Sequence, residues 1–383
     1  MIKVPFLDLK ASFAEIQDAL ENAMLVSVRS GQYIGGDSLV SFERDFQSFV
    51  DSDYCIGVAN GLDALVLSLK VLGIGPDDEV IVPSNTFIAT WLAVTHCGAV
   101  VVPVEPNAET YNINASLIEA KITERTKAII PVHLYGQPAD LDEVLMVAKD
   151  HNLYVIEDAA QAIGSYYNDM PLGTIGDFGA ISFHKTKNIQ CGEGGLFISS
   201  NKNYHNRAAH IIEKGTNRLE KTNGSTDKYE WVSLGSSYVL SDIQIASLAA
   251  QLLDEEQVTS LRRAIWKQYH LGLQELESDG LITRPSIEPG SSINGHIYYV
   301  LISKPHIREH IEEYLFLKGI SACSHYEPLH LAPAGRRYGR TPFELNVTED
   351  IAPRLLRLPI WPSMTPIQVQ RVITELVSAL RMG

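Results

Sequence analysis

Two lysines in one short stretch could carry out covalent chemistry. Lys185 and Lys187 lie in the segment Ser182-Phe183-His184-Lys185-Thr186-Lys187, which follows an apolar run and precedes the glycine-rich turn Gly192–Gly195. A lysine amine that is held at the end of a strand and partly removed from water can attack an aldehyde and form a Schiff base. The residue pattern alone leaves both lysines as candidates.

A carboxylate and an amide lie about 25 residues upstream, in Glu157-Asp158-Ala159-Ala160-Gln161, directly after the apolar run 153–156. A buried carboxylate at such a place needs a partner, and a protonated pyridinium nitrogen would satisfy it. Gln161 would lie on the same face and could reach a ring hydroxyl. The ordinary alternatives are a helix N-cap for Asp158 and a surface amide for Gln161.

A phosphate site is indicated at Asn60-Gly61-Leu62, which joins a strand to a helix, because backbone N–H groups at a helix start attract phosphate. Phe87 follows another strand and could stack on a flat ring; an ordinary βα turn and a core aromatic are the alternatives. A lysine, a carboxylate and a phosphate cup are the parts that pyridoxal phosphate (PLP) requires. The fingerprints GxGxxG, after the first strand, and GxxxxGK[ST] are missing, which argues against dinucleotide and P-loop sites.

The composition is that of a globular protein, with 383 residues, 45% hydrophobic and 20% charged. A net charge of −15 argues against nucleic acid as a partner. No apolar run is long enough to span a membrane, and the N-terminal residues lack a signal-peptide pattern, so we expect a cytoplasmic protein. The four cysteines form no CxxC pair, so neither a metal site nor a disulfide framework is expected.

The elements that must position these residues alternate between apolar strands and amphipathic helices from residue 50 to 200. Strands without internal alternation are covered on both faces, and their alternation with helices predicts an α/β fold with a mostly parallel, seven-stranded sheet. Ligands of such sheets bind at the carboxyl ends of strands. The strand candidates are 54–58, 79–82, 99–102, 128–132, 154–156, 180–183 and 196–198, and the helix candidates are 61–71, 86–96, 114–122 and 141–151.

The pattern changes in the C-terminal third of the chain. Residues 215–230 are polar and carry Asn223-Gly224, which predicts a surface loop. A helical stretch begins near Ser241, and a strand is expected at 296–302 within a helix–strand alternation. We therefore expect a large PLP-binding domain with the N-terminal segment over 1–250 and a smaller α/β domain over 251–383.

Together these motifs resemble the family of PLP-dependent sugar-nucleotide aminotransferases, which have PLP fold type I, the fold of aspartate aminotransferase. The resemblance spans essentially the whole chain, and its most specific parts are the segments 157–161 and 182–195. It implies a homodimer with shared active sites and L-glutamate as the amino donor. The further segments that carry it are 5–9, 31–36, 131–136 and 354–359.

The resemblance assigns a role to individual residues. It implies that Lys187, five residues after Ser182, forms the Schiff base. The remaining cofactor contacts that it implies are Asp158 at the ring nitrogen, Gln161 at the ring hydroxyl, Ser182 and the backbone of Gly61 and Leu62 at the phosphate, stacking by Phe87, and Ser237 at the phosphate of the partner subunit. Two departures stand out: Asn60 and Leu62 lie where many members have Ser and Thr, and Ser237 lies where many have Asn.

The substrate is less clear from the sequence. Segments 213–218, 227–229, 235–238 and 325–330 resemble the branch that aminates C4 of a dTDP-linked 4-keto-6-deoxyhexose for surface polysaccharides such as O-antigen and lipopolysaccharide, whereas 60–65 resembles the 3-amino branch. We therefore expect amination at C4, with C3 as the alternative. Lys214 and Arg218 are candidates for the pyrophosphate of the nucleotide sugar, and His330 for the sugar; ordinary surface and structural roles are the alternatives.

Two other functions remain open from the sequence. One is a PLP-binding regulator without catalytic activity. The other is a nicotinamide oxidoreductase on a doubly wound sheet, against which the missing glycine fingerprint argues.

Overall fold

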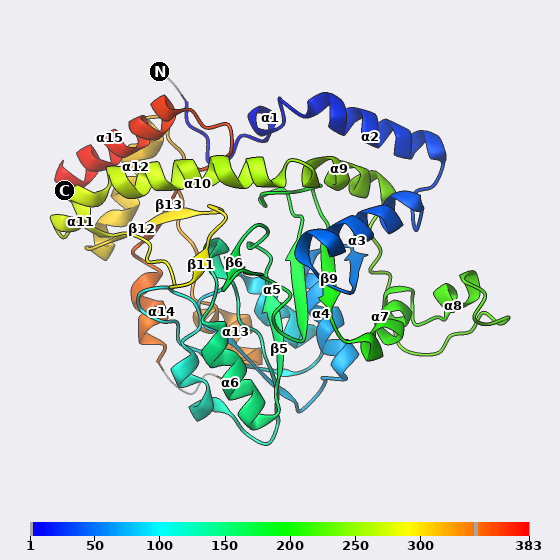
Figure 1. The fold of residues 1–383 in the computed structure, drawn as a ribbon. Helices are drawn as coiled ribbons and strands as arrows, with labels where there is room; N and C mark the ends of the chain where they lie inside the picture. Colours follow the sequence, from blue (N-terminus) through cyan, green and yellow to red (C-terminus); the bar gives the residue numbers. More distant parts are fainter. Residues whose placement is uncertain (1–2, 341–343, 383) are drawn as a thin grey trace.

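The computed structural model describes residues 3–340 and 344–382. A seven-stranded sheet lies at its centre in the order β1-β9-β8-β5-β4-β2-β3 (Figure 1). All neighbouring strands run parallel except β9, which is antiparallel to both β1 and β8. The strands are β1 (Cys55–Val58), β2 (Glu79–Pro83), β3 (Val100–Val104), β4 (Thr126–Ile129), β5 (Tyr154–Asp158), β8 (Phe178–Ser182) and β9 (Gly195–Ser199).

Helices cover both faces of this sheet because its strands are apolar on both sides. Val80 and Val82 of β2 pack with one face, towards α4, α5 and α7, whereas Ile81 between them packs with the other face. The helices on the first face are α4 (Gly61–Leu72), α5 (Ile88–His96) and α7 (His205–Ile212), and those on the second are α3 (Asp37–Val50), α6 (Leu141–His151) and α9 (Asp242–Leu252).

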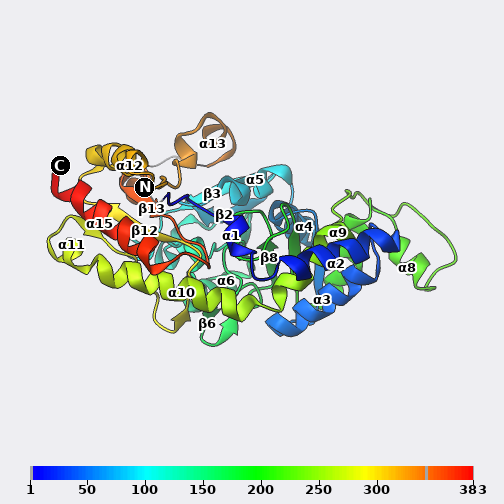
Figure 2. The same ribbon diagram turned by 90° about the horizontal axis from the view of Figure 1, so that it is seen from above.

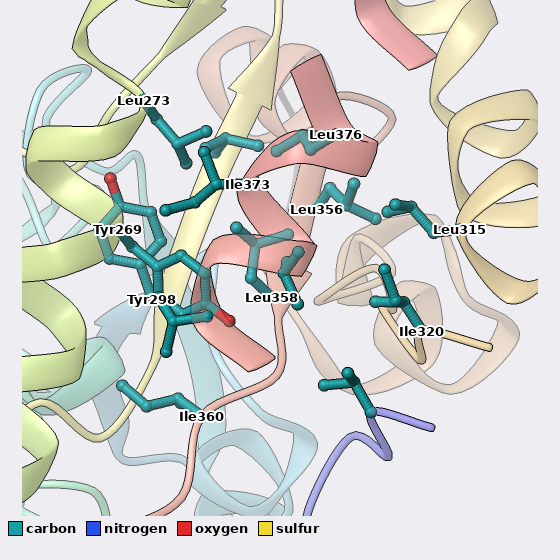
Figure 3. Close-up of a cluster of buried hydrophobic side chains, with 14 of the residues drawn as sticks. Tyr269, Leu273, Tyr298, Leu315, Ile320, Leu356, Leu358, Ile360, Ile373 and Leu376 are labelled. Atoms are coloured by element: carbon teal, nitrogen blue, oxygen red, sulfur yellow. The ribbon is translucent and has the colours of Figure 1, made fainter. Parts of the chain in front are cut away.

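The C-terminal part has its own antiparallel sheet in the order β10-β12-β13 and a separate apolar core. Figure 3 shows this core, in which the rings of Tyr269 and Tyr298 stack with centroids 5.2 Å apart. Val4, from the other end of the chain, is fully buried in the same core and pairs with Ile320. The elements are α10 (Glu255–Gly272), α11 (Gln274–Ser278), β10 (Ile282–Thr283), β12 (Tyr298–Ile302), α12 (Arg308–Leu317), β13 (Leu355–Leu358) and α15 (Pro366–Met382).

Further elements complete the molecule. Two views place α8 at one end of the molecule and the C-terminal helices at the other (Figures 1 and 2). Within the described residues, no helix is both long and apolar enough to cross a membrane. These remaining elements are α1 (Leu9–Ser12), α2 (Gln17–Ser30), α8 (Arg218–Thr222), α13 (Pro333–Tyr338), α14 (Asn346–Ile351), the sheet of β6 (Tyr166–Tyr167), β7 (Met170–Pro171) and β11 (Ser291–Ser292), and 3₁₀ turns at 115–117, 119–121, 134–136, 202–204, 305–307 and 329–331.

The predicted fold class is confirmed, since every strand expected between residues 50 and 200 is present in one mostly parallel sheet. The helix expected at 114–122 is instead two 3₁₀ turns. There, the Asn114 side chain accepts a hydrogen bond from the N–H of Ser116, which favours a tight turn over an α-helix. The polar stretch 215–230 contains the short helix α8. A domain boundary near residue 250 stays a prediction; it would fall inside α9.

Glu157, the fourth residue of β5, binds the loop 173–176 that precedes β8. Its side chain is fully buried, and its Oε2 accepts a hydrogen bond from the N–H of Gly173 (2.8 Å) and lies 2.9 Å from Nε2 of His133. Its Oε1 accepts from the N–H groups of Ile175 (2.6 Å) and Gly176 (2.7 Å). Both carboxylate oxygens are therefore fully used, which is what a buried carboxylate requires.

Glu157→Gln should destabilise the protein by about 3 kcal/mol, because an amide nitrogen cannot accept hydrogen bonds and would leave buried donors unpaired. Urea unfolding followed by circular dichroism measures this loss. Glu124→Gln, at an exposed position, is the matched control and should unfold like the wild type. Equal midpoints for Glu157→Gln and the wild type would contradict this role of the carboxylate.

Candidate active site

Asp158 ends β5 at the carboxyl edge of the large sheet, with 5% of its surface exposed. Thr90 donates a hydrogen bond to its Oδ2 at 2.8 Å, and the N–H of Ala160 donates to its Oδ1 at 3.2 Å. Burial raises the pKa of Asp158, while these hydrogen bonds and the nearby Lys187 oppose the rise. The carboxylate thus lies where a second cation would stabilise it further.

Lys187 lies in the turn between β8 and β9, partly buried, and its backbone N–H donates to the carbonyl of His184 at 2.8 Å. Burial lowers the pKa of its amine to about 8, with Arg357 acting in the same direction and Asp158 against it. A substantial fraction of the amine is therefore neutral near physiological pH. Lys185, the other candidate, is exposed, so the structure favours Lys187 as the nucleophile.

The first turn of α4 forms a cup beside the end of β8. Asn60 caps this helix through a hydrogen bond from the N–H of Asp63, which leaves the N–H groups of Gly61 and Leu62 without an intrahelical acceptor. A Cβ at Gly61 would lie only 2.8 Å from the Cβ of Ser182, so the helix start and the Ser182 side chain can be this close only with glycine at this position. N–H groups and a hydroxyl at a helix start suit a phosphate.

The side chain of Gln161, three residues after Asp158, contacts the C-terminal part of the chain. Its Oε1 accepts from the N–H of Tyr135 at 2.7 Å, and its Nε2 donates to the hydroxyl of Tyr326 at 3.0 Å. The Tyr326 ring lies 5.8 Å from the ring of Phe87, which is the N-cap of α5 and is 52% exposed. The exposed ring of Phe87 therefore lies next to the hydrogen-bonded side chains of Gln161 and Tyr326.

These residues fit pyridoxal phosphate. The amine of Lys187, the buried carboxylate of Asp158 and the cup at Gly61 and Ser182 lie at the ends of neighbouring elements of one sheet. Asp158 could hold a protonated ring nitrogen, Lys187 could bind the aldehyde carbon, and the cup could hold the phosphate. Phe87 could stack on the ring.

Other predicted residues lie away from this cluster. Lys214 and Arg218 are about half exposed, at 53% and 51%, and both pair with Glu213, at 3.5 and 3.4 Å. Ser237 is exposed, and its backbone forms a β-bridge with that of Glu213. His330 is 5% exposed and lies 3.0 Å from Glu349 of α14. Their predicted contacts with substrate or with a partner subunit's phosphate stay predictions.

Sequence reasoning missed four residues at the site. Thr90 contacts Asp158, Tyr135 and Tyr326 contact Gln161, and Arg357 lies close enough to lower the pKa of Lys187. For Thr90 a signal existed, since it lies one helical turn after Phe87, at the start of a helix that follows a strand. Tyr326 and Arg357 belong to the distant C-terminal part, so nothing local in the sequence placed them here. Across the described ranges, no group of three metal-ligating side chains is found.

The chain matches the model of the DegT/DnrJ/EryC1/StrS aminotransferase family over residues 14–377. It is 37% identical over 374 residues to the dTDP-3-amino-3,4,6-trideoxy-alpha-D-glucose transaminase of Streptomyces venezuelae, which covers 97% of this chain and 94% of the relative. It is 38% identical over 371 residues to the dTDP-3-amino-3,6-dideoxy-alpha-D-galactopyranose transaminase of Aneurinibacillus thermoaerophilus, which covers 97% of this chain and 98% of the relative.

Solved structures agree with this match. The crystal structure of DesV from S. venezuelae superposes with a TM-score of 0.91 at 36% identity and covers 99% of both chains. Spr1654 from Streptococcus pneumoniae in its PLP form superposes with a TM-score of 0.88 at 25% identity and covers 95% of this chain and 96% of that one.

The sequence-based prediction of a PLP-dependent sugar aminotransferase is thereby confirmed at the level of family, fold, activity class and cofactor. Both the extent of the family match and the identity to its members exceed what a shared fold alone would give. This chain belongs to the DegT/DnrJ/EryC1/StrS aminotransferase family.

Proposed function

We propose that this chain transfers an amino group from an amino acid, L-glutamate, to the keto carbon of a dTDP-linked deoxysugar, with PLP at Lys187. The observation that carries the proposal is that the partly buried Lys187, in the turn after β8, and the buried carboxylate of Asp158, at the end of the neighbouring parallel strand β5, lie at one edge of the sheet. When bound, PLP supplies an electron sink for the carbon that carries the amine.

The residues of the chain divide the remaining tasks. The amine of Lys187, neutral in a substantial fraction of molecules, takes a proton from the reacting carbon and returns it, as a general base and then a general acid. Asp158 holds the proton on the ring nitrogen and is itself oriented by Thr90. The N–H groups of Gly61 and Leu62 and the hydroxyl of Ser182 bind the phosphate, and Phe87 shields one face of the ring from water.

For the position of amination, we propose C3 as the first candidate. Two relatives at 37% and 38% identity are named as transaminases of 3-amino sugars, and segment 60–65 resembles the same branch. Amination at C4 is the second candidate, because segments 215–229 and 325–330 resemble the 4-amino branch. Lys214 and Arg218 are proposed contacts of the pyrophosphate, and His330 of the sugar. A use of the product in surface polysaccharides stays a prediction.

We also propose a homodimer in which Ser237 serves the phosphate site of the partner subunit. The support is a set of exposed apolar side chains near Ser237: Tyr229, Trp231 and Leu234 are 60%, 75% and 86% exposed. Apolar side chains gathered on one surface favour association with another protein surface, and a two-fold pair is the commonest arrangement.

Borohydride reduction of the PLP-loaded protein followed by peptide mapping should label Lys187. In the protein without PLP, modification of Lys187 by an amine-reactive reagent should be half-maximal near pH 8, because only the neutral amine reacts. Asp158→Asn should move this midpoint lower, since the carboxylate raises the pKa of Lys187. Labelling of Lys185, or an unmoved midpoint in Asp158→Asn, would contradict the assignment.

Product analysis tests the position of amination. The protein is incubated with L-glutamate and dTDP-4-keto-6-deoxyglucose, with and without a 3,4-ketoisomerase. We expect a product only with the isomerase, and NMR should place nitrogen on C3. Turnover without the isomerase and nitrogen on C4 would support the second candidate, and no amination by PLP-loaded protein would favour a regulatory role.

Leu234→Asp should convert the dimer to a monomer in sedimentation velocity, because a charge would be placed in an apolar contact between the subunits. Phe316→Asp is the matched control: Phe316 is 72% exposed in α12, which lies at the other end of the molecule from α8 (Figures 1 and 2). A fully active wild-type monomer would refute the proposed dimer.

A further inference from the structure

The turn that carries Lys187 is fixed by the next residue, Asn188. The side-chain Oδ1 of Asn188 lies 2.8 Å from Nδ1 of His296, which belongs to the C-terminal part of the chain. Among the residues that the structure describes, Nδ2 of Asn188 is buried without a hydrogen-bond partner. The contact with His296 therefore holds the side chain of Asn188, and with it the backbone next to Lys187.

His296 is the neutral donor of this pair. It is 4% exposed, and burial lowers its pKa well below the usual value, with Lys187 and Arg262 among the cations that act in the same direction. A neutral imidazole carries one proton, and Oδ1 of Asn188 can only accept, so the proton lies on Nδ1. His296 thus adds no positive charge next to the amine of Lys187, and the hydrogen bond stays the same at all pH values near 7.

Arg262 of α10 fixes the backbone of His296. Its buried guanidinium donates from Nη2 to the carbonyl of His296 at 2.8 Å and from Nε to the carbonyl of Gly295 at 3.3 Å. Gly295 has a φ of +64°, and a Cβ at this position would lie 2.8 Å from the backbone carbonyl carbon of Arg262. Segment 294–296 therefore lies directly against α10, which requires glycine at position 295.

Asn294 joins the same segment to the other side of the site. Its buried Nδ2 donates to the carbonyls of Gln161 at 2.8 Å and Ile163 at 2.7 Å. Its Oδ1 accepts a hydrogen bond from the N–H of His296 at 2.9 Å. One short segment of the C-terminal part therefore sets the position of the Lys187 turn relative to the segment of Gln161.

We propose that His296 is a positioning residue for Lys187 and acts through Asn188, which holds the lysine-bearing turn in place. This inference rests on the proposed function, in which the amine of Lys187 binds PLP and then moves the proton. The amine must leave the cofactor and return to the reacting carbon, and a small displacement of its backbone would slow this step. His296 fulfils this role without contact to the reacting atoms.

The test measures the surroundings of the Lys187 amine in the full-length protein without PLP. In His296→Phe, the pH at which an amine-reactive reagent modifies half of Lys187 should rise by about one pH unit. The reason is that a released turn lets water reach the amine, whereas burial lowers its pKa in the wild type. Phenylalanine fills a similar volume but has no N–H donor. His296→Asn keeps a donor near the position of Nδ1 and should restore the wild-type midpoint.

A second variant and a control separate this contact from a general loss of stability. Asn188→Ala removes the other partner and should raise the midpoint equally, and the double variant should show no further rise, since both changes remove one hydrogen bond. His270→Phe is the matched control: His270 also lies in α10, where its ring stacks on Trp266, and the midpoint should not move. An unmoved midpoint in either single variant, or additive rises, would overturn the proposal. If His296→Phe does not fold, Asn188→Ala alone decides.

The two half-reactions separate a role at the lysine from a role at a substrate. In PLP-loaded His296→Phe, transfer from the amino donor and transfer to the keto sugar should both slow by the same factor, on the order of 10- to 100-fold, because one amine moves the proton in both. Slowing of only one half-reaction would place His296 at a substrate and overturn the proposal. The midpoints are measured without PLP or substrate, so borohydride labelling of a lysine other than Lys187 would refute the proposed function without removing this test.

Discussion

The active site depends on keeping an amine and a carboxylate close together where water is scarce. Burial alone would neutralise both groups, since it lowers the pKa of Lys187 and raises that of Asp158. Their mutual attraction acts against burial on both, and the hydrogen bonds from Thr90 and Ala160 stabilise the ionised carboxylate further. Burial therefore leaves the amine more reactive, and the carboxylate gains from the cation and the hydrogen bonds beside it, which is the combination that a pyridinium cofactor requires.

The sheet creates this balance through its topology. Parallel strands β5 and β8 end at the same edge, so residues far apart in sequence meet there. The reversed strand β9 returns the chain past the helix start of α4, and the contact is so close that a Cβ at Gly195 would lie 2.4 Å from the carbonyl carbon of Asn60. Glycine at positions 61 and 195 therefore lets a helix end, a strand end and a reactive turn share one small volume.

Much of this could be predicted from the sequence, because strands, strand ends and helix starts are local properties. The lysine-bearing turn, the carboxylate after β5 and the cup at Asn60-Gly61-Leu62 all follow from short patterns. Burial is not local, so the local pattern left both lysines as candidates; the family resemblance chose Lys187, and the structure shows in addition that Lys185 is exposed. Tyr326 and Arg357 reach the site through long-range packing of the C-terminal part, and no pattern near residue 187 could indicate them. The two 3₁₀ turns within 115–121 are a different case, because the Asn114 side chain binds the N–H of Ser116 only two residues away, and this local signal was overlooked.

Val4 gives the C-terminal core an unexpected dependence on the start of the chain. Its side chain packs with residues between 265 and 380, and its backbone joins Gly319 and Ser321 through hydrogen bonds of 2.9 Å each. Contacts between such distant residues close a very long loop, which slows folding because the entropy of closure is lost before the contact forms. The C-terminal core can therefore be completed only after synthesis has passed residue 380, and until then the segment that contains Val4 lacks its packing partners. Unfolding of the C-terminal core would release the N-terminal segment around Val4, which continues into the large part. We therefore expect the C-terminal part and the large part to unfold in one cooperative step.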